Sequence, residues 1–170
     1  MPSPIAHSVT GLVVYKLLHD KQAVIWKKPS YVMVLCMFIA VLPDLDFIPQ
    51  LLTGRKYHHT FTHSVTFAML FALAAAIIAR LLNKQIFRIA LFALTLYGSH
   101  LALDFFTEGG RGIQLFWPFS EKLFISPATF FPGTHHSEGS FSRVHLFFIF
   151  FELLYSLLLL TGLYIWKKRN

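Results

Sequence analysis

Residues Ile86 to Phe106 read IFRIALFALTLYGSHLALDFF, an apolar run that carries His100 and Asp104 near its end. As a helix that rises about 1.5 Å per residue, the run is long enough to cross a bilayer core of about 30 Å. His100 and Asp104 lie four residues apart, so both project from one face of that helix. Because an ionisable side chain in hydrocarbon costs a few kcal/mol unless it is paired, solvated or bound to a metal, this pair predicts a functional site.

The composition of the whole chain indicates an integral membrane protein. Of its 170 residues, 55% are hydrophobic and only 14% are charged, and the mean hydropathy is +0.58. These values exclude an ordinary soluble domain and a disordered segment. We therefore expect an all-α fold, an integral membrane bundle of about five helices that forms a single domain over residues 1–170. The expected helices lie near residues 4–19, 30–42, 63–82, 86–106 and 145–166, with an outer loop over 107–143. The last three helices are long enough to cross the core unaided.

The second expected helix is too short to cross the membrane. The run from Ser30 to Leu42 ends at Pro43 and covers only about 20 Å. We expect the backbone from Pro43 to Pro49 to be non-helical. Because such backbone is tolerated at membrane depth only inside protein or beside a wet cavity, Asp44 and Asp46 should face a pocket.

The positions of lysine and arginine predict the orientation of the bundle. The larger group should face the cytoplasm by the positive-inside bias. It contains Lys21, Lys27, Lys28, Arg80, Lys84, Arg88, Lys167, Lys168 and Arg169, against Arg55, Lys56, Arg111, Lys122 and Arg143 on the other side. The N-terminus then faces out and the C-terminus faces in. The net charge of +7 is mainly a signal of topology, and no basic stripe predicts nucleic-acid binding.

In this topology, His and Asp residues from separate segments converge at the extracytoplasmic end. The candidate metal ligands are His7, Asp44, Asp46, His58, His63, His100 and Asp104. Imidazole and carboxylate suit Zn, Fe, Ni or Mn, and we expect the divalent metal to be Zn²⁺. The ligands are numerous enough for two ions, which together would ionise a water and stabilise both the attacking and the leaving oxygens.

Each part of this pattern also has a structural interpretation. The pair His100 and Asp104 could be a buried hydrogen-bonded pair, and Asp44 could cap a helix end. His58 and His59 could lie in a solvated loop. The metal interpretation is favoured because all these residues share one membrane face.

Other polar residues are weaker candidates. His59, Ser64 and Trp117 are candidates for substrate contact, and Ser64 alternatively starts a helix or orients a ligand. For Glu152, within the last helix, we expect a structural role. A lid, a headgroup contact and an ordinary loop all stay open for His135, His136 and His145.

Several short motifs occur in an order that is typical of one family. They are His7 with Gly11, Pro43-Asp44-Leu45-Asp46, the segment His58 to Ser64, and His100 to Asp104 followed by Gly109-Gly110 and Trp117-Pro118-Phe119. Over most of its length the chain thus resembles the DUF457 family of predicted inner-membrane metal-dependent hydrolases, typified by a LexA-regulated protein of enteric bacteria. The resemblance implies a multi-pass metallohydrolase of the bacterial inner membrane. One departure is His59, because the family typically has arginine there.

More remotely, the order His, Asp, His, HxxxD is similar to the zinc-dependent phospholipase C and P1-nuclease group. This similarity implies that the leading ligands are His7, Asp44, His63, His100 and Asp104, with Asp104 a candidate bridge between metals. It leaves His58 and Asp46 as lesser ligands or as groups that orient imidazoles.

From these features we expect hydrolysis of a phosphoester or related bond in a lipid or lipid-linked substrate at the outer membrane face. Asp46 and Asp104 are the expected catalytic residues, and Asp46 or another carboxylate of the pocket handles the proton. One alternative is a divalent-metal transporter that uses the same side chains as a transport site. The other is a non-catalytic membrane scaffold in which a structural metal holds helices together. The sequence does not predict the oligomeric state.

Overall fold

The computed structural model describes residues 2–19, 29–55, 58–108, 112–132 and 143–169, and its regular elements are helices. They are α1 (Pro4–His19), α2 (Pro29–Val41), the 3-10 helix η1 (Leu42–Asp46), α3 (Phe47–Thr53), the 3-10 turn η2 (Phe61–His63), α4 (Val65–Leu81), α5 (Ile86–Phe105) and α6 (Arg143–Arg169). Within these described ranges the only β-type pairings are isolated bridges, Thr107 with Phe131 and Ile113 with Phe124. The all-α prediction is confirmed.

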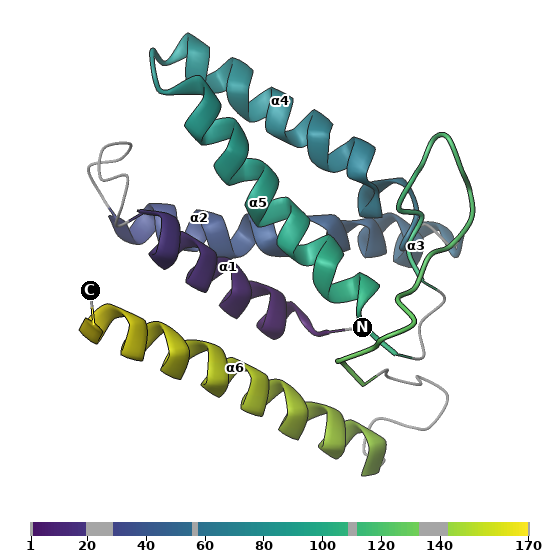
Figure 1. The fold of residues 1–170 in the computed structure, drawn as a ribbon. Coiled ribbons are helices and arrows are strands. Elements are labelled where there is room, and N and C mark those ends of the chain that lie inside the picture. The colour runs from purple at the N-terminus through teal and green to yellow at the C-terminus, as the bar shows by residue number, and fades with distance from the viewer. Residues whose placement is uncertain (1, 20–28, 56–57, 109–111, 133–142, 170) are drawn as a thin grey trace.

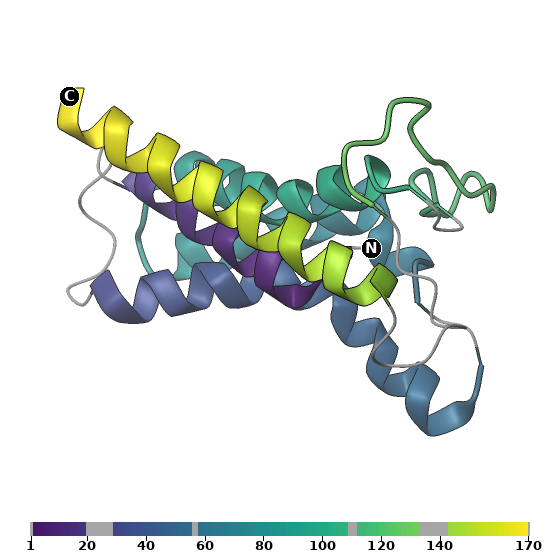
Figure 2. The same ribbon diagram turned by 90° about the horizontal axis from the view of Figure 1, so that it is seen from below.

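The second α-helix ends before Pro43, as predicted, but the expectation of non-helical backbone from Pro43 to Pro49 is wrong. Helical backbone continues through η1 into α3, so Ser30–Thr53 forms one helical stretch of 24 residues. Pro43 stands in the first turn of η1, where a missing backbone N–H removes no helical hydrogen bond. The chain bends at this point, and Figure 2 shows α3 turning away from the direction of α2. Asp44 and Asp46 therefore project from a tight helical turn.

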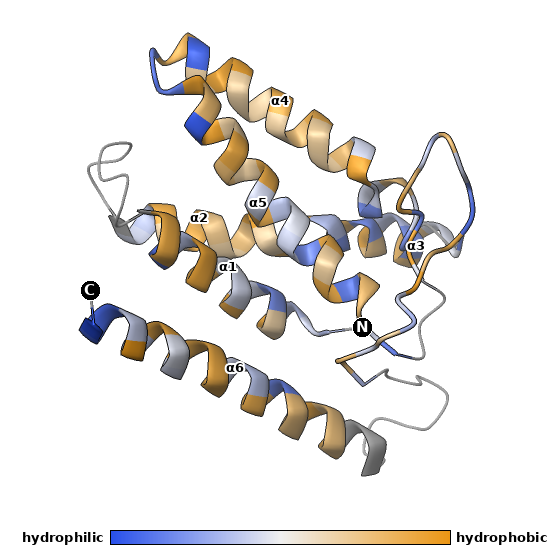
Figure 3. Ribbon diagram, viewed as in Figure 1, coloured by the Kyte–Doolittle hydropathy of each residue, from blue (hydrophilic) through white to orange (hydrophobic). Residues whose placement is uncertain are grey.

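Three helical stretches are long and apolar enough to span a membrane, namely Ser30–Thr53, Ile86–Phe105 and Leu146–Arg169. Pro4–Leu18 and Val65–Leu81 are apolar but shorter. The stretch Ser30–Thr53 is thus longer than the helix predicted over residues 30–42. Helix α4, which was predicted to cross the membrane core unaided, has only 17 residues. Hydrophobic residues cover most of the helices, and hydrophilic residues concentrate towards their ends (Figure 3).

The helices run back and forth between two ends of the bundle (Figure 1). Helices α4 and α5 form an antiparallel pair, α1 packs against α2 and α6, and α5 also contacts α1 and α2. Gly11 permits the close approach of α1 to α2, because a Cβ atom there would lie only 2.7 Å from Ala40 Cβ. The N- and C-termini lie at opposite ends of the bundle. The orientation in the membrane and the assignment of a single domain stay predictions.

Candidate metal centre

Four side chains from three elements meet at the end of the bundle where α1 begins and α5 ends. Asp44 projects from η1, His63 ends η2, and His100 and Asp104 lie in the last two turns of α5. Each offers one ligand atom, and these four atoms all lie within 4.8 Å of one another. His63 and His100 are completely buried and Asp104 is 4% exposed. We call these four residues the central cluster.

The donor atoms of the central cluster are evenly spaced. His63 Nε2 and His100 Nε2 are 3.2 Å apart, and each lies 3.2 Å from Asp104 Oδ2. Asp44 Oδ1 lies 3.6 Å from His63 Nε2 and 3.5 Å from His100 Nε2. Four ligands about 2.0–2.1 Å from a tetrahedral Zn²⁺ are separated by roughly 3.3 Å. The measured separations therefore fit a divalent cation of this kind.

Hydrogen bonds on the far side of both imidazole rings fix which nitrogen faces the centre. His100 Nδ1 donates to the backbone carbonyl of Ala40 at 2.8 Å. His63 Nδ1 is hydrogen-bonded with the Thr62 hydroxyl at 3.1 Å and lies 3.2 Å from Asp46 Oδ2. In the neutral rings, both Nε2 atoms then carry lone pairs that face each other and two carboxylates. Such an arrangement is typical of metal-ligating histidines, whose other ring nitrogen is held by a carbonyl or a carboxylate.

Several polar atoms at the centre also lack a hydrogen-bond partner. Among the described residues, buried side-chain atoms without one include Asp44 Oδ1 and both carboxylate oxygens of Asp104. A buried carboxylate is costly unless it is paired or coordinates a metal. The residues therefore fit a metal ion by their chemistry as well as by their spacing.

His7 lies directly beside the central cluster. Its ring is completely buried and stacks on His100, with the ring centroids 3.8 Å apart. His7 Nε2 lies 3.6 Å from Asp104 Oδ1, and neither ring nitrogen of His7 has a hydrogen-bond partner. Asp104 thus faces the central cluster with one oxygen and His7 with the other, an arrangement compatible with the predicted bridging role.

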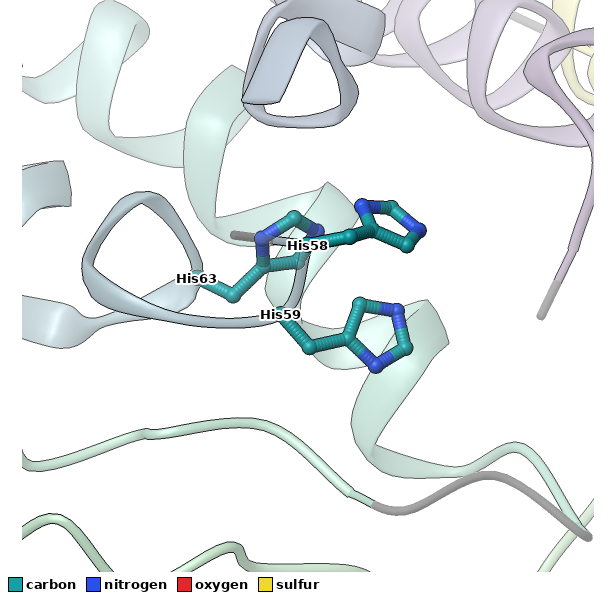
Figure 4. Close-up of side chains that lie close together, drawn as sticks. All are labelled: His58, His59 and His63. Carbon is teal, nitrogen blue, oxygen red and sulfur yellow. The ribbon is translucent and has the colours of Figure 1, made fainter. Parts of the chain in front are cut away.

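A second group, the supporting cluster, surrounds Asp46 and consists of Asp46, His58, His59 and Thr62. Asp46 Oδ1 lies 2.6 Å from His58 Nδ1. Asp46 Oδ2 accepts hydrogen bonds from the Thr62 hydroxyl at 2.6 Å and from the His59 backbone N–H at 3.2 Å. Figure 4 shows the rings of His58, His59 and His63 close together. The nitrogens of these three rings form a second group within metal-binding distance of one another.

Hydrogen bonds from the segment after α5 fix the position of His59. His59 Nδ1 donates to the backbone carbonyl of Gly112 at 3.1 Å, and Gln114 N–H donates to the His59 carbonyl at 3.2 Å. Gly112 has φ +83°, and a Cβ atom there would lie 2.5 Å from Phe124 O. Only glycine fits this position. His59 itself has φ 69°, in the left-handed region.

Two histidines, His63 of the central cluster and His59 of the supporting cluster, have pKa values that are shifted in opposite directions. Burial alone would lower the pKa of His63, but the nearby carboxylates of Asp104, Asp44 and Asp46 raise it well above its usual value. This position therefore attracts positive charge, from a proton or from a metal ion. Burial and the nearby His63 lower the pKa of His59 to about 4. His59 is thus neutral at physiological pH.

The structural interpretations of these motifs do not describe the geometry. Asp46 precedes α3 without making a side-chain cap, and Asp44 Oδ1 accepts no hydrogen bond. His58 and His59 are only partly exposed and contact the supporting cluster. His100 and Asp104 do approach each other, but within a larger set of ligand atoms.

The weaker candidates lie outside the central cluster. Ser64 begins α4, where its Oγ accepts from Phe67 N–H and donates to Phe61 O. The Trp117 ring packs against Phe61, with centroids 5.9 Å apart. Glu152 accepts hydrogen bonds from the backbone N–H and the hydroxyl of Ser3, which is a structural contact. His135 and His136, and the side chain of His145, lie outside the described residues.

Sequence reasoning missed three groups that position the histidines. They are the backbone carbonyls of Ala40 and Gly112 and the hydroxyl of Thr62. A carbonyl leaves no mark in a sequence, since every residue has one. Thr62 did leave a signal, because it stands next to His63 in the histidine-rich segment.

Helices long enough to span a membrane, together with buried His and Asp side chains at one end, are the features of a membrane protein with candidate metal-binding residues. A model of the YdjM inner membrane protein family matches residues 1–170, so the chain belongs to this family, the DUF457 family. The chain is also similar to the inner membrane protein YbcI of Escherichia coli (strain K12). The two are 29% identical over 133 residues, which cover 75% of this chain and 73% of that protein. No solved structure matches, and the remote similarity to zinc-dependent phospholipase C finds no support.

Proposed function

We propose that this protein is a metal-dependent hydrolase that cleaves a phosphoester or related bond of a lipid or lipid-linked substrate. The observation that carries the proposal is the arrangement of the four candidate ligand atoms in the central cluster. Two imidazole nitrogens and two carboxylate oxygens are aimed at one buried point, at separations that suit a divalent cation. Intramembrane ionisable groups arranged in this way are expected to be functional.

The residues that would hold the cation are Asp44, His63, His100 and Asp104, and we expect the cation to be Zn²⁺. When bound there, the cation would supply Lewis acidity and positive charge for the developing negative charge of the reaction. The Ala40 carbonyl and Asp46 hold the two histidines in the orientation that binding requires.

The two expected catalytic aspartates have different roles in this proposal. Asp104 Oδ1 has no hydrogen-bond partner and lies 3.6 Å from His7 Nε2, so it can accept a proton beside the reacting bond. Asp46 uses both of its oxygens to hold His58, Thr62 and the His59 backbone. We therefore assign Asp46 a positioning role and leave proton transfer to Asp104.

A lipid substrate is supported by the apolar surface next to the site. In the segment after α5, the exposed aromatic residues include Phe116, Phe119 and Phe130, at 49%, 88% and 68% exposure. Exposed apolar side chains grouped on one segment suit a membrane or an amphiphile. We propose that this end of the bundle lies at the headgroup level of the extracytoplasmic leaflet.

The proposal is tested by measuring metal content and lipid turnover on the same samples. Wild type, His100→Ala and Asp104→Ala are purified in detergent, analysed for bound metals, and incubated with a mixed bacterial lipid extract. We expect near-stoichiometric zinc and a lipid product from wild type, and loss of both in the two variants. Glu121→Ala is the matched control, because Glu121 is an exposed acidic residue outside both clusters.

Two results would overturn the proposal. One is metal and turnover that persist in His100→Ala and Asp104→Ala. The other is a wild type that binds metal without forming any lipid product but carries metal across vesicles in a manner that depends on Asp104, which would favour a transporter.

A further inference from the structure

Two cavities between α2 and α4 share the side chain of Phe71 as a wall. The first has a volume of about 530 Å³, and Asp46, Thr62 and Tyr97 are among its lining residues, so it begins beside the supporting cluster. The second has a volume of about 260 Å³ and continues from Phe71 past Ala75 towards the far end of α4. We call the two cavities together the α2–α4 cleft. The cleft leads from the candidate site into the apolar part of the bundle.

The walls of the second cavity are apolar and partly made of small residues. Ala74, Ala75 and Ala79 of α4 line it opposite Leu35 and Ile39 of α2. An alanine leaves room that a larger side chain would fill. Leu35 also belongs to the exposed surface, at 48% exposure. The cavity is therefore accessible from the side of the bundle, where the bilayer would lie.

The α2–α4 cleft is longer than one leaflet of a bilayer, because its lining continues beyond Ala75 to Leu82. From Val65, at the start of α4, to Ala75 the helix rises about 15 Å, at about 1.5 Å per residue. The hydrocarbon core of one leaflet is also about 15 Å thick, half of about 30 Å. A chain whose polar end lies beside Thr62 would therefore extend to the neighbourhood of Ala75.

The surroundings of the second cavity favour a hydrocarbon chain. Its lining residues are apolar except for Lys84, and Leu35, Ile78 and Leu82 among them are 48%, 56% and 50% exposed. At the depth of the bilayer core, the medium around these side chains is lipid hydrocarbon. An acyl chain can therefore enter the cavity directly from the bilayer.

We infer that the α2–α4 cleft binds one acyl chain of the membrane lipid on which the protein acts, with the headgroup linkage beside Thr62 and the central cluster. This inference rests on the proposed function, because it names the part of the substrate that the metal centre does not touch. It makes Ala74 and Ala75 determinants of acyl-chain binding. It also requires that the substrate carry a hydrocarbon chain, which excludes water-soluble phosphate esters.

The test uses photocrosslinking of the full chain in nanodiscs that contain a glycerophospholipid with a diazirine at the end of one acyl chain. Labelled positions are mapped by mass spectrometry. We expect label on α2 and α4 near Ala75 in wild type. We expect Ala75→Trp, which fills the cleft, to reduce that label at least fivefold.

A matched control and a second blocking variant guard against loss of folding. Ile77→Trp introduces the same side chain on α4 at a residue that is 52% exposed and is not among the cleft-lining residues, so the label should persist. Ala74→Phe blocks the cleft with a smaller ring and should also reduce the label. Thermal unfolding of each variant shows whether it is folded.

The outcomes separate this inference from the proposed function. Equal labelling of Ala75→Trp and Ile77→Trp, or label spread evenly over all lipid-facing helices, would overturn the inference even if wild type hydrolyses lipid. A crosslink between two copies through α4 would overturn it as well. Label in the cleft that Ala75→Trp removes would support the inference, and its persistence in an inactive Asp104→Ala variant would show that chain binding does not require the metal centre.

Discussion

Asp44 and Asp46 stand two residues apart in η1, and their surroundings are opposite. Asp44 Oδ1 is buried and accepts no hydrogen bond, whereas both oxygens of Asp46 have partners. Asp44 faces the imidazole nitrogens of the central cluster, and Asp46 holds the back of His63. The aspartate side chain is thus available to a ligand in the central cluster, at Asp44, and holds neighbouring residues in place in the supporting cluster, at Asp46.

The difference follows from the cost of burying polar groups. A fully hydrogen-bonded carboxylate stabilises the fold that surrounds it, and removing it leaves buried donors without a partner. A buried carboxylate without a hydrogen-bond partner is costly to the fold until it binds a cation. Variants of the two clusters should therefore separate the loss of metal binding from the loss of stability.

Asp44→Ala should have the largest effect on metal binding. We expect the affinity for Zn²⁺ to fall by more than the 10–100-fold that is typical when an outer partner of a ligand is lost, because a donor atom itself is removed. In the metal-free protein, we expect a smaller loss of stability than for Asp46→Ala, since no hydrogen bond to Asp44 Oδ1 is lost and only its charge interaction with His63 is removed. Metal titration and thermal unfolding without metal measure the two quantities. A metal-free protein that is strongly destabilised would show that Asp44 is a structural residue.

Asp46→Ala should show the converse pattern. The change leaves the Thr62 hydroxyl, the His59 N–H and His58 Nδ1 without their carboxylate, so we expect a loss of about 3 kcal/mol. In a chain of this size, that corresponds to a decrease of about 6–12 °C in the unfolding midpoint. Zinc affinity should fall by about 10–100-fold, through misorientation of His63. If Asp46→Ala kept its unfolding midpoint and lost all metal, Asp46 would be a ligand and the contrast with Asp44 would fail.

The sequence predicted which residues lie close together better than it predicted their roles. Spacing alone placed His100 and Asp104 on one helix face, because helix geometry is local. The difference between Asp44 and Asp46 depends on Thr62 and His58, which approach from another segment, so no local pattern contains it. The assignment of Asp46 as a catalytic residue stays a prediction, and the geometry favours a positioning role.

The helices were predicted well except where proline was involved. The apolar runs gave the ranges of α1, α2, α4, α5 and α6 to within a few residues. Pro43 does follow the end of α2, but it also occupies a position in the first turn of η1 that tolerates proline, so helical backbone continues where a non-helical segment was predicted. Whether a proline ends one helix or begins the next depends on the backbone that follows it, which composition does not specify.

Gly11→Val should have an intermediate effect, because it acts on the central cluster through the backbone. A Cβ atom at Gly11 would lie 2.7 Å from Ala40 Cβ and 2.8 Å from Cys36 O, so α1 and α2 must move apart. We expect a loss of about 1–3 kcal/mol from overpacking. We also expect weaker zinc binding, because Ala40 supplies the carbonyl that orients His100. Unfolding midpoints and zinc titrations measure both effects.

Gly98→Ala is the matched control for this variant. Gly98 lies within α5, and a Cβ atom there would meet nothing within 4 Å. The variant should be more stable by up to about 1 kcal/mol, because alanine favours the helix, with unchanged zinc binding. Equal zinc binding by Gly11→Val and Gly98→Ala would show that the contact between α1 and α2 does not position the central cluster.

His59→Asn should have the smallest effect. It removes one hydrogen bond of the supporting cluster and changes no residue of the central cluster. Asparagine tolerates the left-handed backbone of this residue, so the loop should persist, and only the hydrogen bond to the Gly112 carbonyl is lost. We expect a loss of stability of less than about 1.5 kcal/mol near pH 7 and a change in zinc affinity below threefold.

The same variant tests the pH dependence of stability. The pKa of His59 is lowered to about 4 in the folded protein. Between about pH 4 and 6.5, the unfolded chain therefore binds the extra proton, and stability falls as the pH falls. The asparagine variant lacks this contribution. Unfolding midpoints of the variant and of wild type, measured from pH 4.5 to 7.5, should therefore converge as the pH falls and cross before the acid end, whereas a constant difference would mean that His59 does not titrate as a buried neutral ring.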